Sequence, residues 1–257
     1  MAGVAFVDAQ YVPIEQARIP ILDWGFLRSD ATYDVVHVWR GSFFRLADHT
    51  ERFLRGVRRL IAEHMARAHR EVPPVTWVEE CDFGNVSLER LLATTLKACA
   101  LSLQEFPELN ARLEADEIVY LDRYDLGLAV QTDQGLVVPV VRDCDSRSLD
   151  ELDAEARRLA EAARAGALTP EELRGSTFTL TSAGKQAGLF QTPIVNHPEV
   201  AILSIGRIAE RPVVRDGEVV PRPVGYVALT FDHRVVDGAR AAEFGLAVIR
   251  RLEQPST

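Results

Sequence analysis

Three residues in the second half of the sequence, His233, Asp237 and Thr181, are of types that move protons or donate hydrogen bonds in active sites. The segment TFDHRVVDG places His233 and Asp237 directly after a strand-like apolar run. A neutral imidazole accepts a proton near physiological pH, because the unperturbed pKa of histidine is about 6.5. In STFTLTS, Thr181 lies on the polar side of an alternating strand. Each residue alone also fits a structural role, since Asp-Gly is common turn chemistry and threonine is common in strands.

The spacing of apolar residues predicts the elements that position these three side chains. GYVALTF is predicted as a strand that leads to His233, and GARAAEFGLAVIRRLE as a helix after Asp237. Hairpins are predicted around residues 8–10, at Arg40-Gly41 and around the turn at 132–134. Two further helices are predicted from His49 to Pro73, with Gly56 inside, and from Ser87 to before Pro107. A third is predicted to begin at the capping box of Ser148 and Glu151 and to end at Gly166. A short fourth helix is predicted to start at Thr169, Pro170 and Glu172.

Composition restricts the class of protein. The 257 residues are 47% hydrophobic, which is enough for one sizeable core or two small ones. A formal net charge of -9 argues against nucleic acid as a partner. The sequence starts without a basic leader and lacks a run of about 18 apolar residues, so we expect a cytoplasmic protein that does not span a membrane.

Metal and phosphate chemistry find little support in the sequence. The cysteines Cys81, Cys99 and Cys144 are odd in number and far apart, so they predict neither a disulfide framework nor a zinc site. His64 and His69 are five residues apart, whereas ligation from one helix face needs a spacing of three or four. We expect no bound metal, and no GxxxxGK phosphate loop is present.

An ordered series of segments over about 200 residues resembles the catalytic domain of the dihydrolipoamide acyltransferases of 2-oxo acid dehydrogenase complexes. The segments are RRLIAEHMARAHREVP, EFPELNARL, RYDLGLAVQTDQGLVVPVVRD, LTPEELRGSTFTLTSAGKQAG, TPIVNHPEVAILSIGRI and FDHRVVDGARAAEF. The resemblance implies an α/β (α+β) domain with the chloramphenicol acetyltransferase-like fold, a mixed sheet flanked by helices. We place this domain at residues 55–257.

The resemblance also implies roles for the three residues. The family's catalytic histidine falls on His233 and its aspartate on Asp237, within the DHRxxDG signature. The family hydroxyl that faces the reacting carbonyl falls on Thr181, where many relatives have serine. His233 would deprotonate the thiol of coenzyme A or of a dihydrolipoyl group, and Thr181 would donate to the oxyanion. Asp237 would hold the histidine loop through an ion pair with an arginine.

Assembly follows from the same resemblance. The family's active site lies between the subunits of a trimer, and trimers build larger hollow cores with other dehydrogenase components as partners. The lipoyl group is carried by another domain or chain, and the acyl group is open among acetyl, succinyl and branched-chain groups. The alternative is an inactive oligomeric scaffold, favoured by the missing lipoyl arm and by the short EECDFGNVS segment. Pro73-Pro74 stands in place of the family's Pro-His step, a departure that bears on coenzyme A binding.

A second resemblance covers residues 1–54, in which SDATYDVV and FRLADHTERF are similar to the N-terminal part of fold-type IV aminotransferases. In that family an arginine at the position of Arg52 contacts the phosphate of pyridoxal phosphate. The chain has two lysines, Lys97 and Lys185, and both lie in acyltransferase-like segments. Because a Schiff base requires a lysine in the aminotransferase context, we expect a small β-rich appendage without bound pyridoxal phosphate.

Overall fold

The computed structural model describes residues 4–7, 10–13, 38–39, 42–43, 56–133, 135–182 and 184–254. The chain divides into two compact units, Met1–Leu54 and Arg55–Thr257. In the first unit, the described residues form two short antiparallel pairs, as the sequence predicts. They are β1 (Val4–Val7) with β2 (Gln10–Pro13), and β3 (Val38–Trp39) with β4 (Ser42–Phe43).

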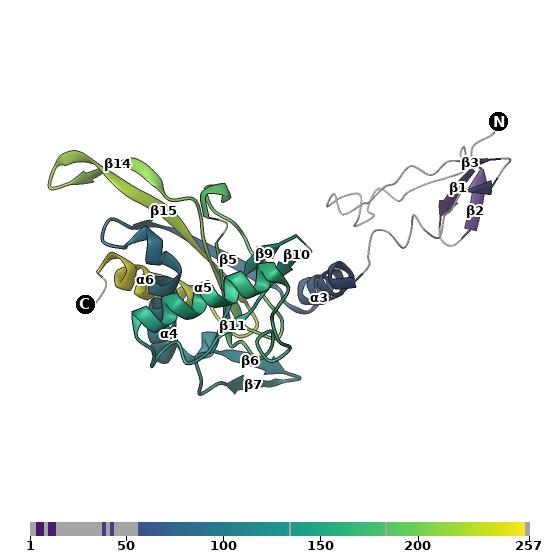
Figure 1. Ribbon diagram of the computed structural model, residues 1–257, viewed down its shortest axis with the longest axis horizontal. Coiled ribbons are helices and arrows are strands. Elements are labelled where there is room, and N and C mark those ends of the chain that lie inside the picture. Colours follow the sequence, from purple (N-terminus) through teal and green to yellow (C-terminus); the bar gives the residue numbers. More distant parts are fainter. Residues whose placement is uncertain are drawn as a thin grey trace. The chain divides into compact units, whose positions relative to one another are not determined.

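A seven-stranded mixed sheet forms the centre of the second unit (Figure 1). Its strand order is β11, β8, β12, β13, β15 and β14, and β5 also pairs with β15. β12 runs parallel to β8 and β13, whereas the other pairs are antiparallel. The strands are β5 (Pro74–Asp82), β8 (Leu126–Leu128), β11 (Val140–Val141), β12 (Phe178–Ser182), β13 (Ala201–Ile205), β14 (Ala209–Arg215) and β15 (Glu218–Asp232).

Two small hairpins lie outside this sheet. One is formed by β6 (Ala111–Glu114) and β7 (Glu117–Tyr120), and the other by β9 (Val130–Thr132) and β10 (Gly135–Val137). The β9–β10 pair confirms the strand, turn and strand predicted around residues 132–134.

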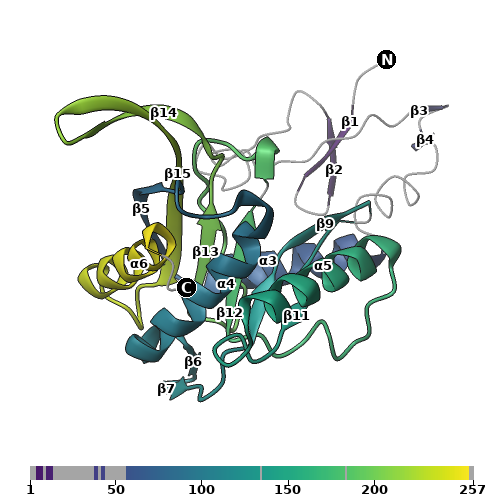
Figure 2. The ribbon, with the colours of Figure 1, turned by 60° about the vertical axis from the view of Figure 1, so that its left-hand side comes forward.

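Helices α4 (Leu91–Glu105), α5 (Leu149–Ala165) and α6 (Gly238–Glu253) lie on one face of the sheet (Figure 2). Their apolar side chains form the main core with the strand residues on that face, including Leu96, Leu159, Phe178, Leu203, Phe231 and Phe244. α3 (Gly56–Glu71) leads into a second, smaller cluster of Val72, Val195 and Ile202. The result is the mixed sheet flanked by helices that the sequence predicts. In the described part of the chain, every helix is too short or too polar to cross a bilayer.

The start of α5 confirms the predicted capping box. The Ser148 hydroxyl accepts a hydrogen bond from the Glu151 backbone N–H at 3.3 Å, and the Glu151 carboxylate accepts one from the Ser148 N–H at 2.8 Å. At the other end, Gly166 has a left-handed φ of 66° and caps the helix. Both ends of α5 are predictable from the sequence, because each cap depends on only a few neighbouring residues.

The structure describes α3 from Gly56 to Glu71, and the predicted stretch from residue 49 to 55 lies outside the described residues, so the position of Gly56 inside a longer helix stays a prediction. The predicted helix at Thr169 needs correction. After α5, Thr169 and Glu172 exchange the predicted capping bonds, yet residues 170–173 form only a turn. There the backbone carbonyls of Glu171 and Arg174 accept hydrogen bonds from Arg142. The short 3-10 turns are η2 (Leu88–Arg90), η3 (Pro107–Leu109) and η4 (Gly184–Gln186).

Candidate active site

His233 lies in the turn that follows β15. The backbone N–H of His233 donates to the Pro73 carbonyl at 3.2 Å, and that of Asp232 donates to the Val200 carbonyl at 2.8 Å. The turn is therefore held from two sides, by the segment after α3 and by the start of β13. The imidazole is exposed, with its ring centre 5.7 Å from that of Phe231. Within the described part of the chain, its ring nitrogens form no hydrogen bond, so they are available to a substrate.

Asp232, which the sequence reading left without a role, fixes this turn. Its buried carboxylate accepts a hydrogen bond from the Arg234 backbone N–H at 3.0 Å and pairs with the Arg234 guanidinium at 2.6 Å. This side-chain hydrogen bond raises the pKa of Arg234. A sequence signal was present, because an aspartate and an arginine directly flank the histidine in DHR.

Asp237 occupies the N-cap position of α6 with an extended backbone, but its side chain makes no capping hydrogen bond. Its backbone carbonyl accepts the N–H of Ala241 at 3.0 Å. Among the described residues, Asp237 forms no ion pair with an arginine. The aspartate–arginine pair of this segment belongs instead to Asp232 and Arg234.

Thr181 and His233 lie toward opposite ends of the sheet. In the strand register, Thr181 of β12 pairs with Ser204 of β13, which pairs with Ala228 of β15. His233 is five residues beyond Ala228, roughly 16 Å along a strand, and two strand spacings add roughly 10 Å sideways, which separates the two Cα atoms by roughly 19 Å. One chain therefore keeps the hydroxyl and the imidazole apart.

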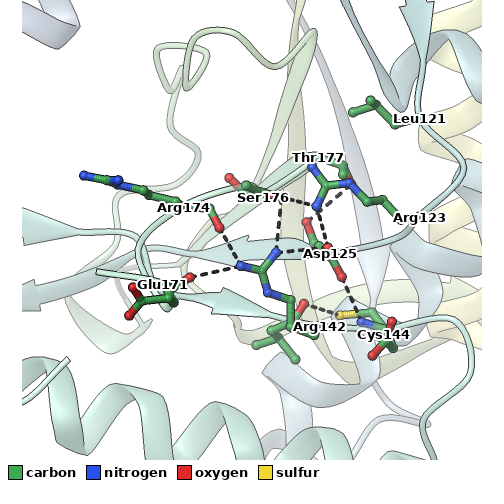
Figure 3. Close-up of polar contacts among 12 residues, drawn as sticks. Leu121, Arg123, Asp125, Arg142, Cys144, Glu171, Arg174, Ser176 and Thr177 are labelled. Atoms are coloured by element: carbon green, nitrogen blue, oxygen red, sulfur yellow. Dashed lines mark hydrogen bonds and ion pairs between the residues drawn. The ribbon is translucent and has the colours of Figure 1, made fainter. Parts of the chain in front are cut away.

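A cluster around Asp125 holds the start of β12 (Figure 3). The buried Asp125 carboxylate pairs with Arg123 at 2.6 Å and with Arg142 at 3.0 Å, and accepts the Asp143 backbone N–H at 3.1 Å. The backbone carbonyl of Asp125 accepts the N–H of Thr177 at 2.7 Å. Arg142 also binds the carbonyls of the preceding turn. These contacts fix the loop from which β12 carries Thr181 across the sheet.

Glu199 is a second functional candidate that the sequence reading missed. It is buried, and its carboxylate accepts hydrogen bonds from Ser176 Oγ at 2.5 Å, Thr179 Oγ1 at 2.6 Å and Asn196 Nδ2 at 2.9 Å. Burial raises the pKa of this carboxyl to about 7, although the three hydrogen bonds oppose the shift. The available signal was a glutamate directly before the apolar run VAIL at the start of β13.

A cavity of about 250 Å³ lies beside the histidine turn. Its walls are mostly apolar and its polar atoms include the paired hydroxyls of Thr76 and Thr230, 2.8 Å apart. Thr230 is close to the end of β15, and Pro74 pairs with Asp232 in the sheet. The cavity has room for a small, largely apolar group, although His233 itself is not among its lining residues.

The described residues contain no group of three or more histidine, cysteine, aspartate or glutamate side chains that could hold a metal ion. His64 donates to Asn196 Oδ1 at 3.0 Å. The ammonium of Lys97 donates to the backbone carbonyls of Asp145 and Arg147 at 2.6 and 2.7 Å. Lys97 is thus engaged in holding a loop.

Comparison with known proteins places these residues in context. The model for the 2-oxoacid dehydrogenases acyltransferase catalytic domain matches residues 47–257. Over 220 residues the chain is 43% identical to the lipoamide acyltransferase component of the branched-chain alpha-keto acid dehydrogenase complex of Pseudomonas aeruginosa. That match covers 79% of this chain and 51% of the relative. The chain spans about half the length of the curated relatives it matches.

Solved structures show the same fold. The dihydrolipoamide acetyltransferase of Azotobacter vinelandii aligns with a TM-score of 0.73 and 36% identity, over 77% of this chain and 88% of that one. That structure was used to investigate a serine, a histidine and an asparagine in catalysis, with the serine 52 positions before the histidine and the asparagine four after it. The cubic core of the pyruvate dehydrogenase multienzyme complex also aligns with a TM-score of 0.73, at 36% identity over 76% of this chain and 88% of that chain.

Proposed function

Because the chain belongs to the 2-oxoacid dehydrogenase acyltransferase (catalytic domain) family, we propose that it moves an acyl group between dihydrolipoamide and coenzyme A. His233 is the base in this proposal, Thr181 donates to the oxyanion, and Asp237 ends the histidine loop at the N-cap of α6. Coenzyme A and a dihydrolipoyl group are the substrates, and the lipoyl group comes from another domain or chain. The relatives handle different acyl groups, so the acyl group stays open.

The proposed reaction uses the exposed imidazole of His233 directly. The neutral ring accepts the proton of the attacking thiol, and the thiolate forms a bond to the carbonyl carbon of the thioester. The carbonyl oxygen becomes an oxyanion, to which the Thr181 hydroxyl donates a hydrogen bond. When the carbon–sulfur bond of the leaving group breaks, the imidazolium returns its proton to the departing thiolate. The overall step exchanges one thioester for another and needs no redox partner.

The spacing of three residues carries this proposal. Thr181, His233 and Asp237 stand 52 and four positions apart, the separations of the serine, histidine and asparagine investigated in the Azotobacter enzyme. Threonine retains the hydroxyl donor of serine and adds a methyl group. Aspartate in place of asparagine keeps the side-chain oxygen but introduces a charge.

The distance between Thr181 and His233 favours a site shared between two subunits. A hydroxyl must lie within about 3 Å of the oxyanion to stabilise it, which a separation of roughly 19 Å between the Cα atoms excludes within one chain. We therefore propose a homotrimer or a larger core, in which His233 of one chain faces Thr181 of its neighbour. The solved cubic core of a pyruvate dehydrogenase complex supports this arrangement. Other components of a dehydrogenase complex are the expected partners.

Activity is tested with acetyl-, succinyl- and isobutyryl-CoA as donors and free dihydrolipoamide as acceptor. We expect one or more of these donors to be used, and His233→Ala to lose the transfer. Thr181→Val should lose about 10²-fold or more in kcat, whereas Thr181→Ser should keep most of it, because serine restores the donor. Unchanged turnover in Thr181→Val would remove Thr181 from the mechanism. A folded chain that transfers none of the three acyl groups would favour the inactive scaffold.

The first unit has a separate proposal. We infer that residues 1–54 are a β-rich appendage similar to part of a fold-type IV aminotransferase, without bound pyridoxal phosphate. The family match begins at residue 47, and the compact acyltransferase unit begins at Arg55. Limited proteolysis should remove the first unit and leave a stable remainder, and full protection would contradict a loosely attached appendage. Pyridoxal phosphate added to the protein should give no Schiff-base absorbance.

A cytoplasmic location is part of the same proposal. Cys81, Cys99 and Cys144 are all free and buried, and reduced thiols are typical of cytosolic proteins. Fractionation of cells that express the tagged chain tests the location, which recovery in a membrane or secreted fraction would contradict.

A further inference from the structure

Glu199 is a buried carboxylate whose hydrogen-bond donors are all neutral. The residue is 5% exposed and accepts bonds from two hydroxyls and one amide. Among the described residues, it forms no ion pair with an arginine or lysine. A buried carboxylate without a countercharge is costly to ionise, and such groups are more typical of functional sites than of ordinary cores.

The geometry around Glu199 suits the ionised form. Ser176, Thr179 and Asn196 all point donors at it, and a carboxylate can accept all three bonds. The Asn196 amide also donates to Thr179 Oγ1 at 3.2 Å, which turns its Oδ1 toward His64. A protonated Glu199 would carry a donor of its own, so at least one of these bonds would have to rearrange.

Asn196 connects Glu199 to helix α3. Its Oδ1 accepts a hydrogen bond from His64 Nε2 at 3.0 Å. One residue later, His197 Nε2 lies 3.0 Å from the carboxylate of Glu71 in the last turn of α3. The loop that carries Glu199 therefore contacts the second half of α3 at two points, through Asn196 and through His197.

The same loop and helix meet the histidine turn. Two residues after the end of α3, the Pro73 carbonyl accepts the backbone N–H of His233 at 3.2 Å. Directly after Glu199, the Val200 carbonyl accepts the N–H of Asp232 at 2.8 Å. Both backbone acceptors of the turn thus belong to segments that the Glu199 network holds in place.

We propose that Glu199 is a positioning residue for His233. Through Asn196 and His64 it holds α3, and through Val200 it holds the end of β15, so that the imidazole keeps the orientation needed to deprotonate a thiol. This inference rests on the proposed role of His233 as the base. It adds a residue that acts on that base without touching substrate.

The proposal predicts that catalysis depends on the titration of Glu199. Since burial raises the pKa of Glu199 to about 7, the carboxylate that orders the network is the main form only above that pH. The other charged or titratable side chains that line the adjoining cavity of about 330 Å³ are His64, Arg112, Arg123, Arg174 and His197, and Glu71 pairs with His197. Below pH 7, protonation of Glu199 should lower kcat.

Glu199→Gln is the direct test, because glutamine has the same shape but cannot ionise. At pH 8 we expect kcat about tenfold lower than in the unmodified protein, with KM for acyl-CoA changed less than twofold. On the acid side, log kcat should fall more steeply in the unmodified protein than in the variant, because only the unmodified protein has Glu199 to protonate. Glu155→Gln on α5, which removes a surface ion pair with Arg158, should leave both quantities unchanged. An unchanged kcat and acid slope in Glu199→Gln would overturn the proposal.

A second pair of variants tests the path through α3. His64→Leu removes the donor to Asn196 and should lower kcat about as much as Glu199→Gln does. His64→Gln supplies an amide donor and should recover most of the loss. His64 is only half-buried, so both variants should fold. A His64→Leu variant with normal kcat would exclude this path.

Amide hydrogen exchange separates this inference from the proposed activity. In Glu199→Gln the backbone N–H groups of Asp232 and His233 should exchange at least tenfold faster. The N–H of Phe83, which donates to the Pro223 carbonyl at 2.8 Å, should keep its rate. If the chain transfers no acyl group but these amides respond, the proposed activity fails and the structural link stands. If the chain transfers acyl groups but Glu199→Gln changes neither kcat nor the exchange of these amides, only the positioning role is wrong.

Discussion

Asp232 and Arg234 hold the backbone on both sides of His233. The Asp232 carboxylate accepts the Arg234 backbone N–H at 3.0 Å, while the Arg234 guanidinium donates to both carboxylate oxygens, at 2.6 Å to Oδ2 and 3.0 Å to Oδ1. The histidine between them is exposed, whereas Asp232 is 2% exposed. The arrangement separates the residue that anchors the turn from the residue available for chemistry.

Substitution of this anchor should impair catalysis without removing the base. In Asp232→Asn one oxygen is replaced by a donor, so the paired contacts with Arg234 are lost and the imidazole loses its fixed orientation. We expect kcat to fall about tenfold or more, because small misplacements of reacting groups are costly. Steady-state kinetics measures this, with circular dichroism as the folding control. A folded Asp232→Asn variant with full kcat would show that the turn needs no such anchor.

Glu199 should make stability depend on pH. Its pKa is raised from an ordinary 4.5 to about 7 by burial, so between these pH values the folded state holds a proton that the unfolded chain has released. The stability from Glu199 is therefore fully present below about pH 4.5 and is lost as pH rises through 7. Denaturant unfolding at pH 5, 6, 7 and 8, at one protein concentration, should show the unmodified protein losing stability relative to Glu199→Gln. Parallel pH curves would contradict the assigned burial of the charge.

The three cysteines should resist alkylation in the folded protein. Burial raises the pKa of Cys144 to about 12 and raises those of Cys81 and Cys99 further, so little thiolate forms at pH 8. Mass spectrometry after iodoacetamide treatment should find no adduct until guanidinium is added. Labelling of any of the three in native protein would mean that its region opens readily.

Gly245 should be intolerant of a side chain. A Cβ at this position of α6 would lie 2.1 Å from the Trp77 ring of β5, so in Gly245→Ala either the Trp77 ring or the helix must shift. We expect a loss of about 1–3 kcal/mol in the free energy of unfolding. Gly238→Ala in the first turn of the same helix meets nothing within 4 Å and should not lose stability. Equal stability of the two variants would contradict the packing of α6 on Trp77.

Local signals predicted much of the fold. The capping box at Ser148 and the left-handed cap at Gly166 each depend on neighbouring residues, so the ends of α5 were readable from the sequence. At Thr169 the same local signal was present, but only a turn forms, and Arg142 from another part of the chain donates to the carbonyls of Glu171 and Arg174. The local capping signal therefore did not predict the structure at Thr169, where a side chain distant in sequence donates hydrogen bonds to the backbone carbonyls.

The arrangement of the candidate site could not be predicted without the register of the strands. The sequence gives the types of Thr181 and His233, but their separation depends on two strand pairings between distant segments. Asp232 is an anchor of the turn that the motif alone does not identify, because it depends on the Arg234 guanidinium donating to the carboxylate two residues before it. Glu199 was missed because its partners Ser176, Thr179 and Asn196 are brought together only by folding.

The most direct test of a shared site is complementation between two inactive variants. When His233→Ala and Thr181→Val are co-expressed and purified together, some interfaces join an intact His233 from one chain to an intact Thr181 from its neighbour. Random assembly in a ring should restore about one quarter of the transfer activity of the unmodified protein, because each half is intact in about half of the positions. Activity no higher than that of the separate variants, in a confirmed mixed oligomer, would contradict a site built from two chains.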